Sequence, residues 1–179
     1  MSSFSKLAKK PILIPEGVRL KVVNNVVIAE YGSVSRSLEV SSDVILEIID
    51  GTCKVDAARK VKNCAMIGTF VAKLKNLLRD IKNPYKVCLV LIGVGYKAFK
   101  VDGDIIALSI GYSHLVAFQI PDGIMYNIKD NTEIELSGFV DDVTAFADDV
   151  CKSSPWDPCL QSGIVIKGSF LRRKEGKKK

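Results

Sequence analysis

The chain has 179 residues, of which 47% are hydrophobic and 26% charged, and its formal net charge at pH 7 is +6. Such a composition supports a buried core and excludes general disorder. A membrane-spanning helix needs roughly 18 consecutive apolar residues, whereas the longest apolar run covers residues 87–92. We therefore expect one or two globular domains without a membrane span.

The cysteine and histidine content argues against a metal site. There are five cysteines and a single histidine, His114, and no two cysteines have the Cys-x-x-Cys spacing of a structural zinc site. An odd number of cysteines without paired spacings is typical of reduced thiols in a reducing compartment. We expect no metal and no histidine-dependent catalysis.

The first half of the chain predicts strands followed by one helix. Four segments rich in Val and Ile are separated by turn residues: 13–22, 26–31, 35–40 and 44–49. The period then changes from Val55, and apolar residues recur every three or four positions between Ile67 and Ile81. Asn83-Pro84 ends this helix, because proline disfavours the α conformation of the residue before it.

The second half repeats this order. Six strands are expected, at 85–92, 96–101, 105–110, 115–120, 124–128 and 132–137. An amphipathic helix over 141–151 follows, with acidic residues in its first turn. Strands arranged in hairpins before a helix favour the α+β class with antiparallel or mixed sheets packed against a helix. We expect two such domains, at residues 1–83 and 84–171, and a basic tail at 172–179.

An internal repeat indicates that the two domains are related. Ile14-Pro15-Glu16-Gly17-Val18 reappears 106 residues later as Ile120-Pro121-Asp122-Gly123-Ile124. Proline, an acidic residue and glycine in succession are typical of a turn. In both copies an alternating strand, an Asn-containing turn and a second strand follow. We interpret this match as two small domains that arose from one repeated unit.

The charge is distributed unevenly. Residues 102–149 contain one lysine and ten acidic residues, whereas the tail at 172–179 alone carries +5. Such a tail repels itself, so we expect it to be disordered in the unbound protein. It is either an arm that neutralises phosphates or a solvated tail that aids solubility. Together with the basic first half, it favours nucleic acid as the partner.

Residues Gly93–Ala98 match the Gly-x-Gly-x-x-Ala fingerprint of dinucleotide-binding proteins. That site requires a helix directly after the glycines, so that the helix N-terminus meets the pyrophosphate. Here Asp102-Gly103 follows a short apolar segment, which is typical of a β-hairpin. We therefore expect a hairpin and no nucleotide cofactor. A helix after Gly95 would favour a nucleotide-dependent enzyme instead.

Several of these segments together resemble one family. The chain resembles bacterial-type large-subunit ribosomal protein six in four motifs, which occur in the same order as in that family: Leu91–Ala98, Leu108–His114, Ile120–Ile124 and Phe170–Lys177. Lys10–Val18 matches the usual opening of that family, so the resemblance covers nearly the whole chain. It implies two related α+β domains, no enzymatic activity and no cofactor. It also implies binding to large-subunit rRNA near the factor-binding region, beside neighbouring proteins at the base of the stalk.

The resemblance and the charge together indicate candidate rRNA contacts. The residues singled out are Tyr96, Lys97, Tyr112, Ser113, His114, Lys167, Arg172, Arg173, Lys174, Lys177, Lys178 and Lys179. The lysines and arginines would neutralise phosphates. Either tyrosine would stack on an unpaired base, and Ser113 and His114 would hydrogen-bond to the RNA backbone or 2′-hydroxyls. The tail would become ordered only on binding.

One segment departs from the family. Where its members read Pro-Tyr-Lys-Gly-Lys-Gly-Ile-Arg, this chain has Pro158-Cys159-Leu160-Gln161-Ser162-Gly163-Ile164-Val165. Two lysines and an arginine are therefore missing. The departure suggests a divergent member, on a bacterial cytoplasmic ribosome or, as the second choice, on an organellar one. A free RNA-binding regulator outside the ribosome remains the alternative.

Overall fold

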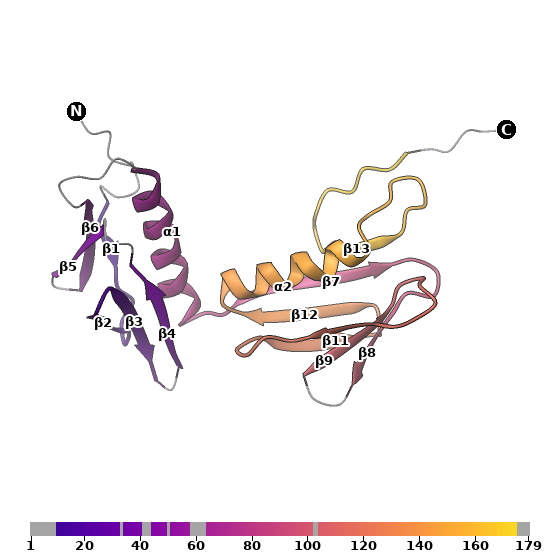
Figure 1. Ribbon diagram of the computed structural model, residues 1–179, viewed down its shortest axis with the longest axis horizontal. Helices are drawn as coiled ribbons and strands as arrows, with labels where there is room; N and C mark the ends of the chain where they lie inside the picture. The colour runs from indigo at the N-terminus through magenta and orange to yellow at the C-terminus, as the bar shows by residue number, and fades with distance from the viewer. Residues whose placement is uncertain are drawn as a thin grey trace. The chain divides into compact units, whose positions relative to one another are not determined.

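The computed structural model describes residues 10–32, 34–40, 44–49, 51–57, 64–101 and 104–174 (Figure 1). The chain divides into two compact units between Pro84 and Tyr85, and each unit has its own sheets and its own helix.

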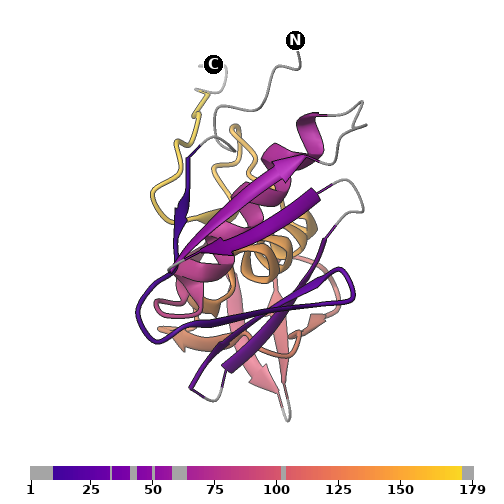
Figure 2. The same ribbon diagram turned by 90° about the vertical axis from the view of Figure 1, so that its left-hand side faces the viewer.

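The first unit contains six strands and one helix, in the order β1 Ile12–Leu13, β2 Arg19–Val23, β3 Val26–Tyr31, β4 Val34–Glu39, β5 Val44–Ile49, β6 Thr52–Ala57 and α1 Cys64–Asp80. The strands form two antiparallel sheets of three strands, ordered β1-β6-β5 and β2-β3-β4. Figure 2 shows these strands in front of helix α1.

Helix α1 supplies one side of the core of the first unit. Ile67, Val71, Leu74 and Leu78 lie four, three and four residues apart, which places them on one face of the helix, and all four are almost fully buried. Helix α1 packs against β6, in which Cys53 and Val55 are buried. The predicted helix is confirmed.

The second unit contains seven strands and one helix, in the order β7 Tyr85–Ile92, β8 Lys97–Val101, β9 Ile105–Ser109, β10 Val116–Gln119, β11 Met125–Lys129, β12 Glu133–Gly138, α2 Val140–Ser153 and β13 Gly163–Ile166. A four-stranded sheet has the order β11-β12-β7-β13, and a three-stranded sheet has the order β10-β9-β8. All pairings are antiparallel. The predicted α+β class is confirmed.

Strand β7 is central to this unit because it pairs with β12 on one side and β13 on the other. Val87, Leu89 and Leu91 alternate along it and are buried in the same apolar core as Val143 and Phe146 of α2. The residues between them, such as Cys88, face away from this core and are partly accessible.

The two units share one topology. In each, the first strand pairs with the sixth, the sixth pairs with the fifth, and the second, third and fourth strands form a separate sheet. The second unit adds β13 to the free side of its first strand. Two related α+β domains are therefore confirmed.

The alignment of the repeat, however, differs from the one that the sequence suggested. An offset of 106 residues places β2 on β11, although β2 belongs to the separate three-stranded sheet and β11 is the edge of the four-stranded one. By topology the counterpart of β2 is β8. The residues at 14–18 and 120–124 match because both segments form the same Pro-acid-Gly turn. In it Gly17 and Gly123 adopt positive φ, at 88° and 90°.

Two strands were not predicted, and one was predicted as too long. Strand β6 was overlooked because only Cys53 and Val55 alternate inward there, which is too short a pattern to separate from the following helix. Strand β13 was overlooked because it has four residues. The strand expected over 13–22 is divided between β1 and β2 by the turn at Pro15–Val18.

We predict that Leu89→Ala destabilises the second unit by about 3 kcal/mol, because it leaves a cavity at a fully buried position of the central strand. Val90→Ala, on the opposite face of the same strand, serves as the control and costs about 1 kcal/mol or less. Urea unfolding of both variants checks this. Equal losses of unfolding free energy in the two variants would show that Leu89 and Val90 do not lie on a buried and an accessible face of β7.

Candidate nucleic-acid interface

The glycine-rich segment after β7 leads into a strand. Gly93, Gly95 and Gly111 all have positive φ, and the amide of Tyr96 donates to the Gly93 carbonyl at 3.3 Å. Strand β8 starts at Lys97 and pairs with β9 as an antiparallel hairpin. The expected hairpin is confirmed. Without a helix after Gly95, the phosphate-binding helix N-terminus of the dinucleotide fingerprint is not formed.

Tyr96 is a packing residue. A Cβ on Gly93 would lie 2.8 Å from the Tyr96 ring, and one on Gly111 would lie 3.6 Å from it, so both loops close on this ring. The Tyr96 hydroxyl lies 3.3 Å from Ser154 Oγ. The ring is half-buried and packs against the core of the second unit, which gives Tyr96 a structural role; its stacking on a base stays a prediction.

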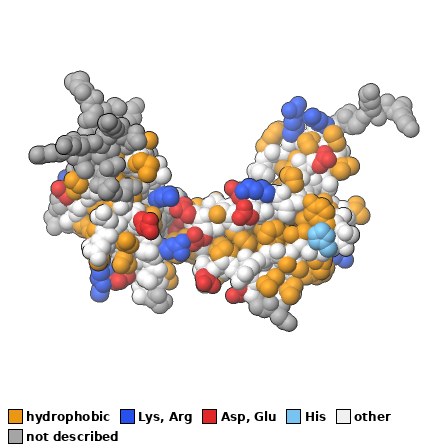
Figure 3. Space-filling model, viewed as in Figure 1, with side chains coloured by type: hydrophobic (Ala, Val, Ile, Leu, Met, Phe, Trp, Pro, Cys, Tyr) orange, Lys and Arg blue, Asp and Glu red, His pale blue; other side chains and the backbone are white. Residues whose placement is uncertain are grey.

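Tyr112 is presented differently. Its side chain is 54% exposed, and its ring stacks on the His114 ring with centroids 5.8 Å apart and planes 12° apart. Its hydroxyl donates to the Ser153 carbonyl at 3.0 Å. Ser113, which lies between Tyr112 and His114 in the sequence, is also exposed. This loop therefore brings Tyr112, Ser113 and His114 together on the surface, and Figure 3 shows the histidine at the edge of an apolar area.

The C-terminal end of α2 joins these loops to β13. Tyr96 contacts the Ser154 hydroxyl, Tyr112 donates to the Ser153 carbonyl, and the amide of Ile164 donates to the Ser154 carbonyl at 2.8 Å. Carbonyls at a helix C-terminus have no partner within the helix, so they accept bonds from elsewhere. Here these bonds join the loop after β7, the loop after β9 and the buried start of β13 to the end of α2.

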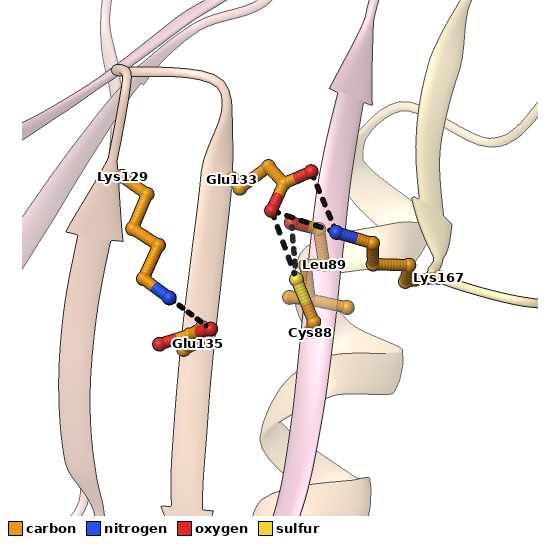
Figure 4. A network of polar contacts seen from close by, with 6 residues as sticks. All are labelled: Cys88, Leu89, Lys129, Glu133, Glu135 and Lys167. Carbon is orange, nitrogen blue, oxygen red and sulfur yellow. Dashed lines mark hydrogen bonds and ion pairs between the residues drawn. The ribbon is translucent and has the colours of Figure 1, made fainter.

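Lys97 and Lys167 differ in their surroundings. Lys97 is exposed at the start of β8, opposite Ser109 of β9. Lys167 Nζ donates to Glu133 at 2.9 and 3.0 Å (Figure 4). This contact lowers the pKa of Glu133 and raises the pKa of Lys167. Lys167 is therefore already partly neutralised, whereas the structure leaves Lys97 exposed.

Glu133 also accepts a hydrogen bond from the Cys88 thiol, with Sγ and Oε2 3.7 Å apart (Figure 4). Burial, and next the charge of Glu133, raise the pKa of Cys88. On the same sheet, Lys129 and Glu135 form an ion pair at 2.7 Å. The face of this sheet that points away from the core therefore carries two ion pairs, beside the exposed Lys86 of β7.

The C-terminal segment after β13 is attached to the loop that precedes it. Trp156 Nε1 donates to the Arg172 carbonyl at 3.0 Å, and the Lys174 amide donates to the Pro158 carbonyl at 3.1 Å. The expectation that the tail becomes ordered only on binding is therefore wrong for residues 172–174. Arg172, Arg173 and Lys174 have exposed side chains, and Figure 3 shows Lys and Arg gathered over this end. Lys177, Lys178 and Lys179 lie outside the described residues.

Gly163 makes the close approach in this loop possible. A Cβ at Gly163 would lie 2.7 Å from Trp156 Cα and 2.8 Å from the Pro155 carbonyl oxygen. The loop also closes on itself, because Asp157 accepts from the amides of Cys159 and Leu160 through one carboxylate oxygen. Sequence reasoning missed Trp156 as the anchor of the tail, since its partner lies sixteen residues away.

Comparisons with known proteins identify the family. No protein-family model matches the chain. Large ribosomal subunit protein uL6 of Methylocella silvestris is 34% identical over 177 residues, which is 98% of this chain and 99% of the relative. The uL6 proteins of Psychromonas ingrahamii and Staphylococcus carnosus are 35% and 33% identical, with coverage of 97% or more of each chain. The chain belongs to the uL6 family, as its sequence motifs indicated.

Within the described ranges, neither helix is long and apolar enough to cross a bilayer.

We predict that Trp156→Phe releases the start of the tail. The variant loses the bond to the Arg172 carbonyl, which is worth about 1 kcal/mol, or about a fivefold change in the open fraction. Trypsin cleavage after Arg172 and Arg173 should become faster by that factor, whereas Tyr85→Phe, at an exposed tyrosine of β7, leaves it unchanged. An unchanged rate in Trp156→Phe would show that this bond does not hold the tail.

Thiol alkylation should follow the surroundings of Cys88. Because its pKa is raised, Cys88 holds less thiolate at pH 8 and should react more slowly with iodoacetamide than the exposed Cys159. Glu133→Gln removes the neighbouring negative charge, so the pKa of Cys88 falls and its alkylation accelerates. Glu135→Gln, a weaker influence on Cys88, has a smaller effect. Peptide mass spectrometry measures each rate, and a slower Cys88 in Glu133→Gln would contradict the assignment.

Proposed function

We propose that the protein is a structural constituent of the large ribosomal subunit that binds large-subunit rRNA. The observation that carries this proposal is the similarity to uL6 proteins along nearly the whole chain, at 31–35% identity. The exposed cations of the C-terminal segment and the aromatic loop at Tyr112–His114 agree with an RNA-binding surface.

The second unit and the tail at 172–179 make the RNA contacts in this proposal. Arg172, Arg173 and Lys174 neutralise phosphates from a segment whose backbone is already held in place, which lowers the entropy lost on binding. Lys177, Lys178 and Lys179 extend the same charge along the sequence.

The loop and the strand ends supply the remaining contacts. Tyr112 and His114 offer stacked rings to an unpaired base, and Ser113 offers a hydroxyl to the RNA backbone. Lys97 adds an exposed cation at the start of β8. Lys167 contributes only where RNA competes with Glu133 for its ammonium group.

The remaining parts of the proposal follow from the family. The binding site lies near the factor-binding region, with neighbouring large-subunit proteins at the base of the stalk as protein partners. The role is structural, without catalysis, metal or cofactor. The bacterial relatives favour a bacterial cytoplasmic ribosome over an organellar one.

A free RNA-binding regulator is the second candidate. It is favoured by the loop before β13, which carries Leu160 at 76% exposure where family members have a lysine. Such a loop would weaken anchoring in the subunit while leaving the basic tail able to bind RNA.

The salt dependence of binding tests the tail contacts. The full chain and the variant Arg172→Ala/Arg173→Ala/Lys174→Ala are titrated onto large-subunit rRNA over a range of salt concentrations. Loss of three phosphate contacts should reduce the slope of log K against log salt by about 2. Lys129→Ala, whose ammonium is paired with Glu135, is the control and keeps the slope. An unchanged slope in the triple variant would remove the tail from the interface.

A further inference from the structure

A groove in the first unit lies between strand β1 and the C-terminal half of helix α1. Its apolar lining comes from Pro11, Leu13 and Pro15 on one side and Leu78 on the other. Leu13 is 77% exposed although it is an aliphatic residue within a strand. Strand β1 is an edge of its sheet, so this lining is not covered by another strand of the described chain.

The helix side of the groove carries three cations. Lys75, Arg79 and Lys82 line it and are exposed. Lys75 and Arg79 lie four residues apart on one face of α1, and Lys82 lies three residues further along, in the turn that follows the helix. Arg79 has a partner, the buried Asp80, at 3.1 Å. Within the described ranges neither Lys75 nor Lys82 has an ion-pair partner, and the groove has no acidic lining residue.

Charge complementarity restricts what can occupy this groove. The terminal segments of this chain are unsuitable, because residues 1–9 carry two lysines and no acid, and residues 175–179 carry three lysines and one glutamate. The phosphates of an RNA backbone would pair with the cations, but RNA would leave the aliphatic lining without a complementary apolar surface. A protein segment with carboxylates beside apolar side chains satisfies both parts of the groove.

We propose that this groove docks an acidic amphipathic helix of a neighbouring protein in the large subunit; the inference rests on the proposed function. Carboxylates about one helical turn apart on the partner match the spacing of Lys75 and Arg79, and Lys82 extends the same charge past the helix end. The apolar face of the partner covers the exposed Pro11 and Leu13, as in other helix-in-groove complexes. The first unit thereby serves protein contact while the second unit serves RNA contact.

Site-directed photo-cross-linking in assembled subunits tests this. The chain carrying Leu13→p-benzoylphenylalanine is expressed in cells, large subunits are isolated by sedimentation, and the irradiated material is digested for mass spectrometry. The expected cross-link joins position 13 to a helical peptide rich in Asp and Glu from another protein. Ile45→p-benzoylphenylalanine, at an exposed position on β5 outside the groove, is the control and does not give this product.

Charge reversal supplies the second measurement. Lys75→Glu/Lys82→Glu in the cross-linking chain should lower the yield of that product about tenfold, because the new carboxylates repel an acidic partner. Lys73→Glu is the matched control: it lies on the same helix outside this groove, so it should leave the yield within about twofold.

The outcomes separate the two proposals. A cross-link to rRNA or to this chain itself, no product above the control position, or a yield insensitive to charge reversal would each overturn the groove assignment while the protein still sediments with the subunit. Absence of the chain from the subunits would overturn the proposed function and the groove assignment together.

Discussion

Three hydrogen bonds at the end of helix α2 determine how the second unit presents its surface. They join Ser153 and Ser154 to the loop after β7, the loop after β9 and the start of β13. These segments are far apart in the sequence, and each carries or precedes a candidate RNA contact. Without this junction, the glycine-rich loops would retain the freedom that their positive φ angles allow.

The junction is stable because the elements beneath it are rigid. Strand β7 is paired on both sides and buries alternate residues against α2, so the helix end and the strand end are fixed relative to each other. From β13 the chain continues to Lys167 and then to the segment held by Trp156. The exposed cations at 172–174 are thus presented by a chain of specific contacts that leads back to the core.

Local signals in the sequence predicted much of this fold. The two helices follow from the spacing of apolar residues, and the Asn-containing turns at Asn24-Asn25 and Asp130-Asn131 follow from turn-forming residues. All of these signals lie in neighbouring residues of the chain. The same local chemistry misled the repeat alignment, because equal turns recur at positions that are not equivalent in the sheets. Local patterns specify elements, whereas sheet order depends on distant pairings.

The candidate site was less predictable for the same reason. Residue type alone made Tyr96 and Tyr112 equivalent, and only the packing of Gly93 and Gly111 around Tyr96 separates them. The pairing of Lys167 with Glu133 joins residues 34 positions apart, and no sequence pattern indicates it. Charge indicated which segments are candidates for RNA contact, but not which cations the protein itself already neutralises.

Sedimentation of a native lysate through a sucrose gradient, at low and at high salt, decides whether the protein is a ribosomal component. We expect it to migrate with the large subunit and to stay there at high salt, because many contacts hold it. Migration at the top of the gradient with intact subunits would contradict the ribosomal assignment and favour a free RNA-binding protein.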